Sequence, residues 1–155
     1  MPPDRSPACS EGAAVIRFTS HSAEETEQFA EQFAKRLRPG DVIACFGGMG
    51  MGKTVFAHGL ARGLGLSDEV SSPTFALVQE YTDGNIPLYH FDMYRVSDFD
   101  SLYSTGFFDY LEQEGVLLIE WSEQIESALP PGAIRLSFAR LDDNTRELTI
   151  EGEEI

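Results

Sequence analysis

The hydrophobic positions of the chain recur with two different periods, which predict that helices and strands alternate in its first half. Residues 14–19 have the composition of a short strand, and the uninterrupted apolar run 42–46 is typical of a strand buried on both faces. The apolar side chains of Phe29 and Phe33 follow the spacing of a helix with one buried face. The same spacing predicts a second helix over residues 53–64.

Both predicted helices have recognisable ends. Ser22 is followed three residues later by Glu25, which is the spacing of a capping box at a helix start. Pro39-Gly40 is expected to end this first helix, because neither residue continues a helix well. Gly65 is expected to end the second helix in the same way.

The second half of the chain is dominated by predicted hairpins. Its predicted elements are strands 75–81 and 88–93 around the turn 82–85, a helix over 98–112 broken around Gly106, a strand over 116–119, a helix at about 122–129, and a final hairpin of strands 134–141 and 147–150. This order predicts a three-layer α/β domain whose mixed sheet is mainly parallel in its centre and carries antiparallel hairpins.

The length of 155 residues fits one domain, which we place at residues 13–155. Residues 1–12 are rich in Pro and Ser and are expected to form a disordered leader. With 42% apolar and 24% charged residues, the composition excludes a wholly disordered chain. Because the chain has neither a long apolar span nor the apolar core of a signal peptide, we expect a cytoplasmic protein with no membrane contact.

The charge and cysteine content narrow the possible functions further. The net charge of −15 makes the surface repel phosphate backbones, so we expect no direct grip on nucleic acid and favour a basic protein partner. The two cysteines, Cys9 and Cys45, form no disulfide framework or metal-binding spacing. Cys45 lies in an apolar run and is expected to be a core residue.

The segment Gly47-Gly-Met-Gly-Met-Gly52-Lys53-Thr54 matches the phosphate-binding pattern G-x-x-x-x-G-K-S/T. Glycines permit the backbone turns that point successive amides at an anion, and the following helix directs its N-terminus toward the phosphates. Lys53 would neutralise the β- and γ-phosphates, and the Thr54 hydroxyl would bind Mg²⁺. An apolar strand precedes the loop and a helix follows it, which is the arrangement that supports this interpretation over a glycine-rich turn without a ligand.

A phosphate loop of this type also needs a carboxylate for Mg²⁺, usually at the end of a neighbouring buried strand. Glu120 follows the apolar run 117–119, and Asp92 follows the predicted strand residues Tyr89-His90-Phe91. An ionised acid in such a place is costly unless it is paired or bound to metal. We assign Glu120 to the metal and Asp92 to the attacking water, with a salt bridge or a solvated strand end as the alternative. His90 is interpreted as a structural histidine.

Four segments together resemble the TsaE (formerly YjeE) family: the phosphate loop, Ser72-Pro73-Thr74-Phe75, His90-Phe91-Asp92-Met93-Tyr94-Arg95 and Ile119-Glu120-Trp121. The resemblance runs from about Val15 to Phe138. Members are bacterial P-loop ATPases that bind ATP or ADP with Mg²⁺ and are needed for the threonylcarbamoyl modification of adenosine 37 (t6A37) in certain tRNAs.

The resemblance implies partners and site residues that the spacing alone does not. ATP hydrolysis, weak without partners, resets a complex of TsaD and TsaB between turnovers, and tRNA is met only through that complex. Metal binding falls on Thr54 and Glu120, and catalysis on Asp92, Glu120 and Lys53. Nucleotide contacts are implied for Gly48, Met49, Gly50, Met51, Gly52, Lys53, Thr54, Val55, Thr74 and Trp121. From the residues alone, Trp121 is equally well explained as a core side chain.

The chain departs from the family pattern in the loop, which usually reads G-D-L-G-A-G-K-T-T. Gly48 replaces the acid, Met51 replaces the small Ala and Val55 replaces the second Thr, while Lys53 and Thr54 are kept. Phosphate binding is therefore expected to survive. A nucleotide-dependent interaction module without hydrolysis stays a second reading, and a small-molecule kinase a third, disfavoured because the nine Arg form no lid-like cluster.

Overall fold

The computed structural model describes residues 14–47, 52–66, 78–82, 84, 86–93 and 96–152. The strands are β1 (Ala14–Ser20), β2 (Val42–Phe46), β3 (Val78–Tyr81), β4 (Leu88–Asp92), β5 (Val116–Glu120), β6 (Ile134–Arg140) and β7 (Arg146–Gly152). The helices are α1 (Ala23–Ala34), α2 (Lys53–Gly63), α3 (Phe99–Ser104), α4 (Phe107–Tyr110) and the 3₁₀ helix η2 (Ser122–Ala128). The expected leader 1–12 and the start of the strand expected at 75–81 lie outside the described residues.

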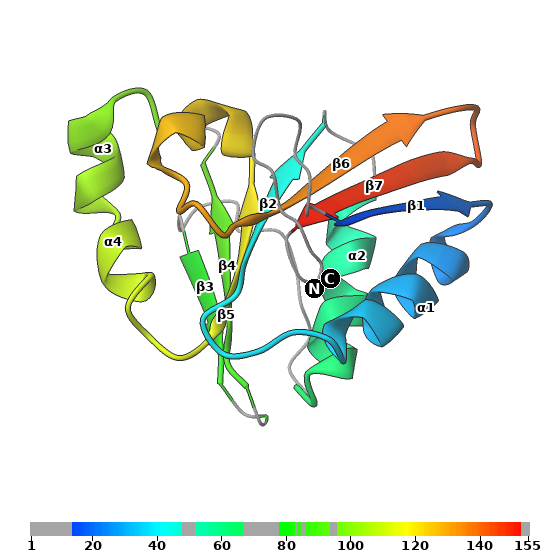
Figure 1. Cartoon of the computed structure of the whole chain (residues 1–155), viewed down its shortest axis with the longest axis horizontal. Coiled ribbons are helices and arrows are strands. Elements are labelled where there is room, and N and C mark those ends of the chain that lie inside the picture. The colour runs from blue at the N-terminus through cyan, green and yellow to red at the C-terminus, as the bar shows by residue number, and fades with distance from the viewer. Residues whose placement is uncertain are drawn as a thin grey trace.

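The strands form one seven-stranded sheet in the order β1-β7-β6-β2-β5-β4-β3 (Figure 1). Its centre is parallel, because β2 pairs in parallel with both β5 and β6, and β4 pairs in parallel with β5. Both edges are antiparallel, through the hairpins β3–β4 and β6–β7 and the pairing of β1 with β7. The predicted mixed sheet with a parallel centre and antiparallel hairpins is confirmed.

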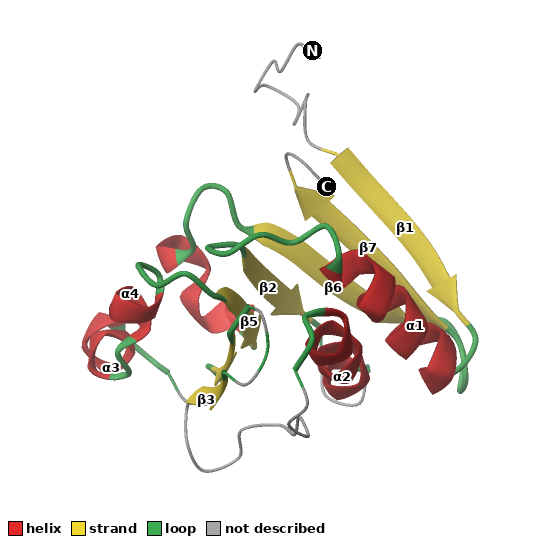
Figure 2. Cartoon of the chain, turned by 90° about the horizontal axis from the view of Figure 1, so that it is seen from below, coloured by secondary structure: helices red, strands yellow, loops and turns green. Residues whose placement is uncertain are grey.

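Helices cover both faces of the sheet, which gives the predicted three layers (Figure 1): in Figure 2, α1 and α2 lie on one side and α3 and α4 on the other. Alternation along each central strand explains why these runs are apolar throughout: in β5, Val116 and Leu118 pack on the side of α1 and α2, whereas Leu117 and Ile119 pack on the side of α3 and α4. Cys45 is buried in the first of these two clusters, as expected for a core residue.

The start of α1 is confirmed, and its end corrects the prediction. The Ser22 side chain caps the helix by accepting the Glu25 amide at 3.1 Å, whereas the Glu25 carboxylate accepts the amide of His21, one residue before the cap. Regular helix ends at Ala34, ahead of Pro39-Gly40, because the following amides bond three residues back instead of four. This tightened turn carries Leu37 into the core.

The other helical predictions hold with adjusted bounds. Gly106, with a φ of 84°, separates α3 from α4 at the predicted break. The helix expected at about 122–129 is a 3₁₀ helix with a kink at Ile125.

The Tyr110 hydroxyl of α4 donates to the Glu80 carboxylate of β3, and this bond raises the pKa of Tyr110 to about 12. In the described part of the chain, no helix has both the length and the apolar character to cross a bilayer.

Helices α1 and α2 approach each other closely at two glycines of α2. A Cβ on Gly59 would lie 2.3 Å from the Glu27 carbonyl oxygen and 2.6 Å from the Ala30 Cβ. Gly63, one turn further along, meets Glu31 and Ala34 at similar distances. The two helices therefore touch backbone to backbone, and only glycine fits at these positions of α2.

We expect Gly59→Ala to lower the free energy of unfolding by about 2 kcal/mol, because the added methyl group has no space and the helices must separate. The intrinsic helix preference of Ala offsets only part of this loss, about 1 kcal/mol. Urea unfolding followed by circular dichroism measures the change. Gly132→Ala is the matched control, since a Cβ there meets no atom within 4 Å. Equal stabilities of the two variants would contradict the close packing of α1 and α2.

Candidate nucleotide-binding site

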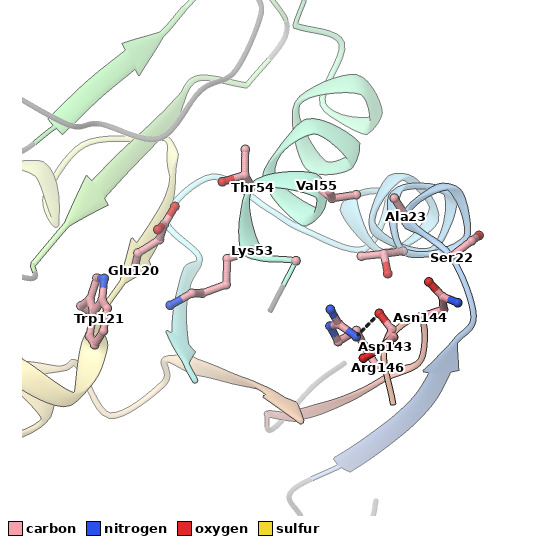
Figure 3. Close-up of a pocket in the computed structure, with 12 residues that line it drawn as sticks. Ser22, Ala23, Lys53, Thr54, Val55, Glu120, Trp121, Asp143, Asn144 and Arg146 are labelled. Carbon is pink, nitrogen blue, oxygen red and sulfur yellow. Dashed lines mark hydrogen bonds between the residues drawn. The ribbon is translucent and has the colours of Figure 1, made fainter. Parts of the chain in front are cut away.

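A cavity of about 560 Å³ opens at the carboxyl ends of β2 and β5 (Figure 3). In open α/β sheets this edge is where ligands bind. The described residues lining it come from the starts of α1 and α2, the end of β5 and the turn between β6 and β7. They are Ser22, Ala23, Thr26, Gly52, Lys53, Thr54, Val55, Glu120, Trp121, Asp143, Asn144 and Arg146.

The start of α2 presents backbone amides and an ammonium group to this cavity. The N-cap residue is Gly52, whose φ of 98° is in the left-handed region and which supplies no side-chain cap. The first backbone amides of a helix have no acceptor within the helix, so without a side-chain cap they can donate to a bound anion. Lys53 is the first helical residue and is only 6% exposed. Its Nζ donates to the Gly47 carbonyl oxygen at 2.8 Å, which ties the two ends of the loop together.

Glu120 is brought to the cavity by the alternation of β5. Leu118 packs on the α2 side of the sheet, so Glu120, two residues later, points to the same side and faces the start of α2 (Figure 3). Glu120 is 6% exposed, and its Oε2 lies 2.5 Å from Nε2 of His90, which is fully buried. As expected for a structural histidine, His90 is buried and its Nε2 is hydrogen-bonded. His90 Nδ1 has no hydrogen-bond partner among the described residues.

Trp121 follows Glu120 with a φ of 62°, the only positive φ of a non-glycine residue in the described part of the chain. This conformation is unfavourable for a large side chain and is held here at a turn from β5 into η2. The turn places the indole ring 4.8 Å from Lys53 Nζ, within cation–π range. Trp121 also packs against the cluster around Phe91, so it is a core side chain that also lines the cavity, and its contact with a nucleotide stays a prediction.

Two further groups, Glu123 and Cys45, lie near this end of the cavity without lining it. The Glu123 carboxylate of η2 accepts the Gly47 amide at 3.0 Å, so the first residue of the loop is held by η2 as well as by Lys53. Burial raises the pKa of the Cys45 thiol far above its ordinary value. Cys45 therefore remains a protonated thiol and is excluded as a nucleophile.

The opposite end of the cavity is formed by the start of α1 and the β6–β7 turn. Asp142 accepts the amides of Asn144 at 2.9 Å and Thr145 at 2.8 Å, and the first of these bonds is the main cause of its lowered pKa. The carboxylate thus stays ionised and shapes the turn. Arg146 donates to the backbone carbonyls of Asp142 and Asp143. The turn therefore carries Asp143 and Asn144 to the cavity rim in a defined conformation.

The structure brings together most of the described residues predicted for the site. Gly52, Lys53, Thr54, Val55, Glu120 and Trp121 all line the cavity. Asp92 is absent from the described lining and lies beside it, half-buried, as the register neighbour of Glu120 at the end of β4. The predicted contacts at Gly48, Met49, Gly50, Met51 and Thr74 lie outside the described residues.

Sequence reasoning missed the wall formed by Ser22, Ala23, Thr26, Asp143, Asn144 and Arg146. The two segments were correctly interpreted as a helix cap and a hairpin turn, which are local features. Their proximity to Lys53 follows from the sheet order, in which β6, β7 and β1 follow one another on one side of β2. A local pattern carries no signal for that order.

The chemistry of the lining fits a nucleotide phosphate with Mg²⁺. An uncapped helix start and a buried ammonium suit phosphate oxygens, and Thr54 and Glu120 provide the hydroxyl and carboxylate oxygens that Mg²⁺ prefers. In Figure 3 the Thr54 hydroxyl and the Glu120 carboxylate both lie above the Lys53 side chain. Among the described residues, no group of three or more acidic, His or Cys side chains forms a complete metal cage.

The parallel strand β2 is followed by a loop and then by α2, a helix that starts with lysine, within a three-layer α/β fold. This arrangement defines the fold of the P-loop NTPases. The comparison with known families narrows this class. Residues 20–148 match the family model described as threonylcarbamoyl adenosine biosynthesis protein TsaE. The chain belongs to the TsaE family.

Individual relatives agree with the family match over most of their length. The chain is 40% identical to the tRNA threonylcarbamoyladenosine biosynthesis protein TsaE of Bacillus subtilis, over 86% of this chain and 84% of that protein. The protein of the same name from Treponema pallidum is 36% identical, over 87% and 99% of the two chains. A crystal structure of Bacillus subtilis YdiB superposes with a TM-score of 0.75 at 34% identity, covering 90% and 86%.

Proposed function

We propose that this protein is a Mg²⁺-dependent ATPase that serves tRNA threonylcarbamoyladenosine (t6A37) synthesis in the cytoplasm. The observation that carries the proposal is the uncapped start of α2, whose buried Lys53 lines one cavity together with Thr54 and Glu120. The names of the relatives place them in this biosynthesis. The role proposed for this chain within that biosynthesis is that of an accessory ATPase.

In this proposal the protein acts by positioning and by neutralising charge. Lys53 and the first amides of α2 hold the β- and γ-phosphates, as the strand–loop–helix arrangement favours. Thr54 and Glu120 would hold Mg²⁺, and the ion would neutralise the negative charge that develops on the departing ADP. Asp92, at the end of the neighbouring strand, orients the attacking water. Hydrolysis yields ADP and phosphate.

We further propose that ATP hydrolysis resets a complex of TsaD- and TsaB-like proteins, and that tRNA is met only through this complex. The charge of −15 supports the indirect contact, because an acidic surface repels RNA and favours a partner with basic residues. A sharp salt dependence of partner binding is expected from the same charge.

The first test uses Trp121 as a built-in probe, since it is the only tryptophan of the chain and lies over Lys53. Addition of ATP or ADP with Mg²⁺ is expected to change its fluorescence saturably. AMP, which lacks the phosphates that Lys53 would hold, is expected to bind at least about tenfold more weakly. No change with any nucleotide, together with no heat of binding in calorimetry, would overturn the proposal.

A nucleotide-dependent interaction module without hydrolysis is the second candidate. The absence of Asp92 from the described lining of the cavity favours it, because the proposed water-orienting group then needs a rearrangement to reach the phosphates. Phosphate release measured with and without the TsaD–TsaB complex separates the two. Release that needs the complex supports the ATPase, and tight ATP binding with no release in either case supports the module.

A further inference from the structure

We propose that His90 is a positioning residue for Glu120, one that fixes the carboxylate through which the proposed function binds Mg²⁺. Strands β4 and β5 are parallel, with His90 beside Leu118 and Asp92 beside Glu120. Because side chains alternate along a strand, His90, Asp92 and Glu120 all point to the α2 side of the sheet. The His90 imidazole thus lies on the same face of the sheet as the Glu120 carboxylate, two residues further from the strand ends that border the cavity.

The hydrogen bonds of His90 indicate that its role is directed at Glu120. Nε2 contacts Glu120 Oε2 at 2.5 Å, and in the described residues Nδ1 has no partner. An ionised carboxylate only accepts, so Nε2 carries the proton of this bond. Since Nδ1 has no partner among the described residues, Glu120 is the one group there that orients the ring, and we expect the Nε2–H tautomer.

This single bond has a consequence for the carboxylate. Oε2 is engaged by His90, so Oε1 of the same group is the oxygen that remains for a cation in the cavity. The ring is fully buried and cannot rotate freely among packed neighbours, so it holds one orientation of Glu120. Groups that orient a metal ligand in this way commonly change metal affinity about 10- to 100-fold when removed.

The test compares His90→Leu, which removes the donor, with His90→Gln, whose amide is long enough to replace it. ADP is titrated against each protein in EDTA, and Mg²⁺ is then titrated into the ADP-saturated protein, both followed by Trp121 fluorescence. For His90→Leu we expect ADP affinity in EDTA within about twofold of wild type, and a Mg²⁺ half-saturation about tenfold higher. His90→Gln is expected to restore most of the Mg²⁺ affinity.

The outcomes separate this inference from the proposed function. If the wild type binds ADP and Mg²⁺ but His90→Leu does so equally well, His90 is not a positioning residue and the proposed function stands. If the wild type binds neither ADP nor Mg²⁺, the proposed function itself fails. Adding His90→Leu to Glu120→Gln is expected to cause no further loss of Mg²⁺ affinity, since the two residues act as one unit.

A measurement on the wild-type protein covers the case in which His90→Leu does not fold. Only His21, His58 and His90 contribute imidazole signals in a ¹⁵N-labelled protein. We expect long-range ¹H–¹⁵N spectra to show the Nε2–H tautomer for His90, and its signals to shift when Mg²⁺ is added to the ADP-bound form. The Nδ1–H tautomer, or signals unchanged by Mg²⁺, would overturn the inference.

Discussion

Replacement of Lys53 by alanine is expected to weaken ATP binding about a hundredfold. Lys53 is buried at the start of α2, with its ammonium group near Gly47 and Trp121. A hydrogen bond between an ammonium and a phosphate contributes about 1.5–3 kcal/mol, and each 1.4 kcal/mol is about a factor of ten in affinity. Isothermal titration calorimetry with ATP and Mg²⁺ measures the loss directly.

The chain supplies its own control for this experiment, because it has only two lysines. Lys35→Ala removes the same charge at the exposed end of α1, away from the described cavity lining. It is expected to leave the ATP affinity within about twofold of the wild-type value, since dissolved ions screen the interaction of an exposed charge with a distant ligand. Unchanged affinity in Lys53→Ala would show that the phosphate-loop interpretation is wrong.

Asp92→Asn is expected to slow ATP hydrolysis about a hundredfold or more in the presence of the partner complex, while ADP affinity stays within about threefold. The reason is that the amide no longer accepts a proton from water, whereas Lys53 and the helix start are untouched. Single-turnover phosphate release with saturating ATP measures the chemical step apart from binding.

Two further variants make the assignment of the acids specific. Glu120→Gln is expected to lose the Mg²⁺ dependence of ADP binding as well as hydrolysis, because Glu120 is assigned to the metal. Asp109→Asn, an exposed acid on α4, is expected to behave like the wild type. If Asp92→Asn hydrolyses ATP at the wild-type rate, Asp92 has no role in orienting water and the non-hydrolysing module gains support.

Much of the fold was predictable because its signals are local. The run 42–46 is apolar at every position since both faces of β2 are covered, and Ser22 caps α1 through an amide three residues away. The end of α1 was not predictable in the same way. Leu37 reaches the core through a tightened turn, a tertiary contact that no helix-ending residue announces.

The residues of the site also differ in whether a local sequence signal or only a tertiary contact reveals them. Lys53, Thr54 and Glu120 were predictable because a sequence motif or the end of an apolar run marks each of them. The bond between His90 and Glu120 was not, because it joins residues 30 apart in the chain through the register of β4 and β5. Asn144 was likewise interpreted only as part of a turn, since its place at the cavity depends on strand order.

The contact of α1 with α2 at Gly59 and Gly63 has a consequence for how the cavity responds to its ligand. Both helices begin at the cavity, with Ser22 and Thr54, and their backbones touch without intervening side chains. Close-packed backbones move together, so the distance between the starts of α1 and α2 is fixed. A nucleotide that enters the cavity therefore meets two helix starts whose spacing is already set.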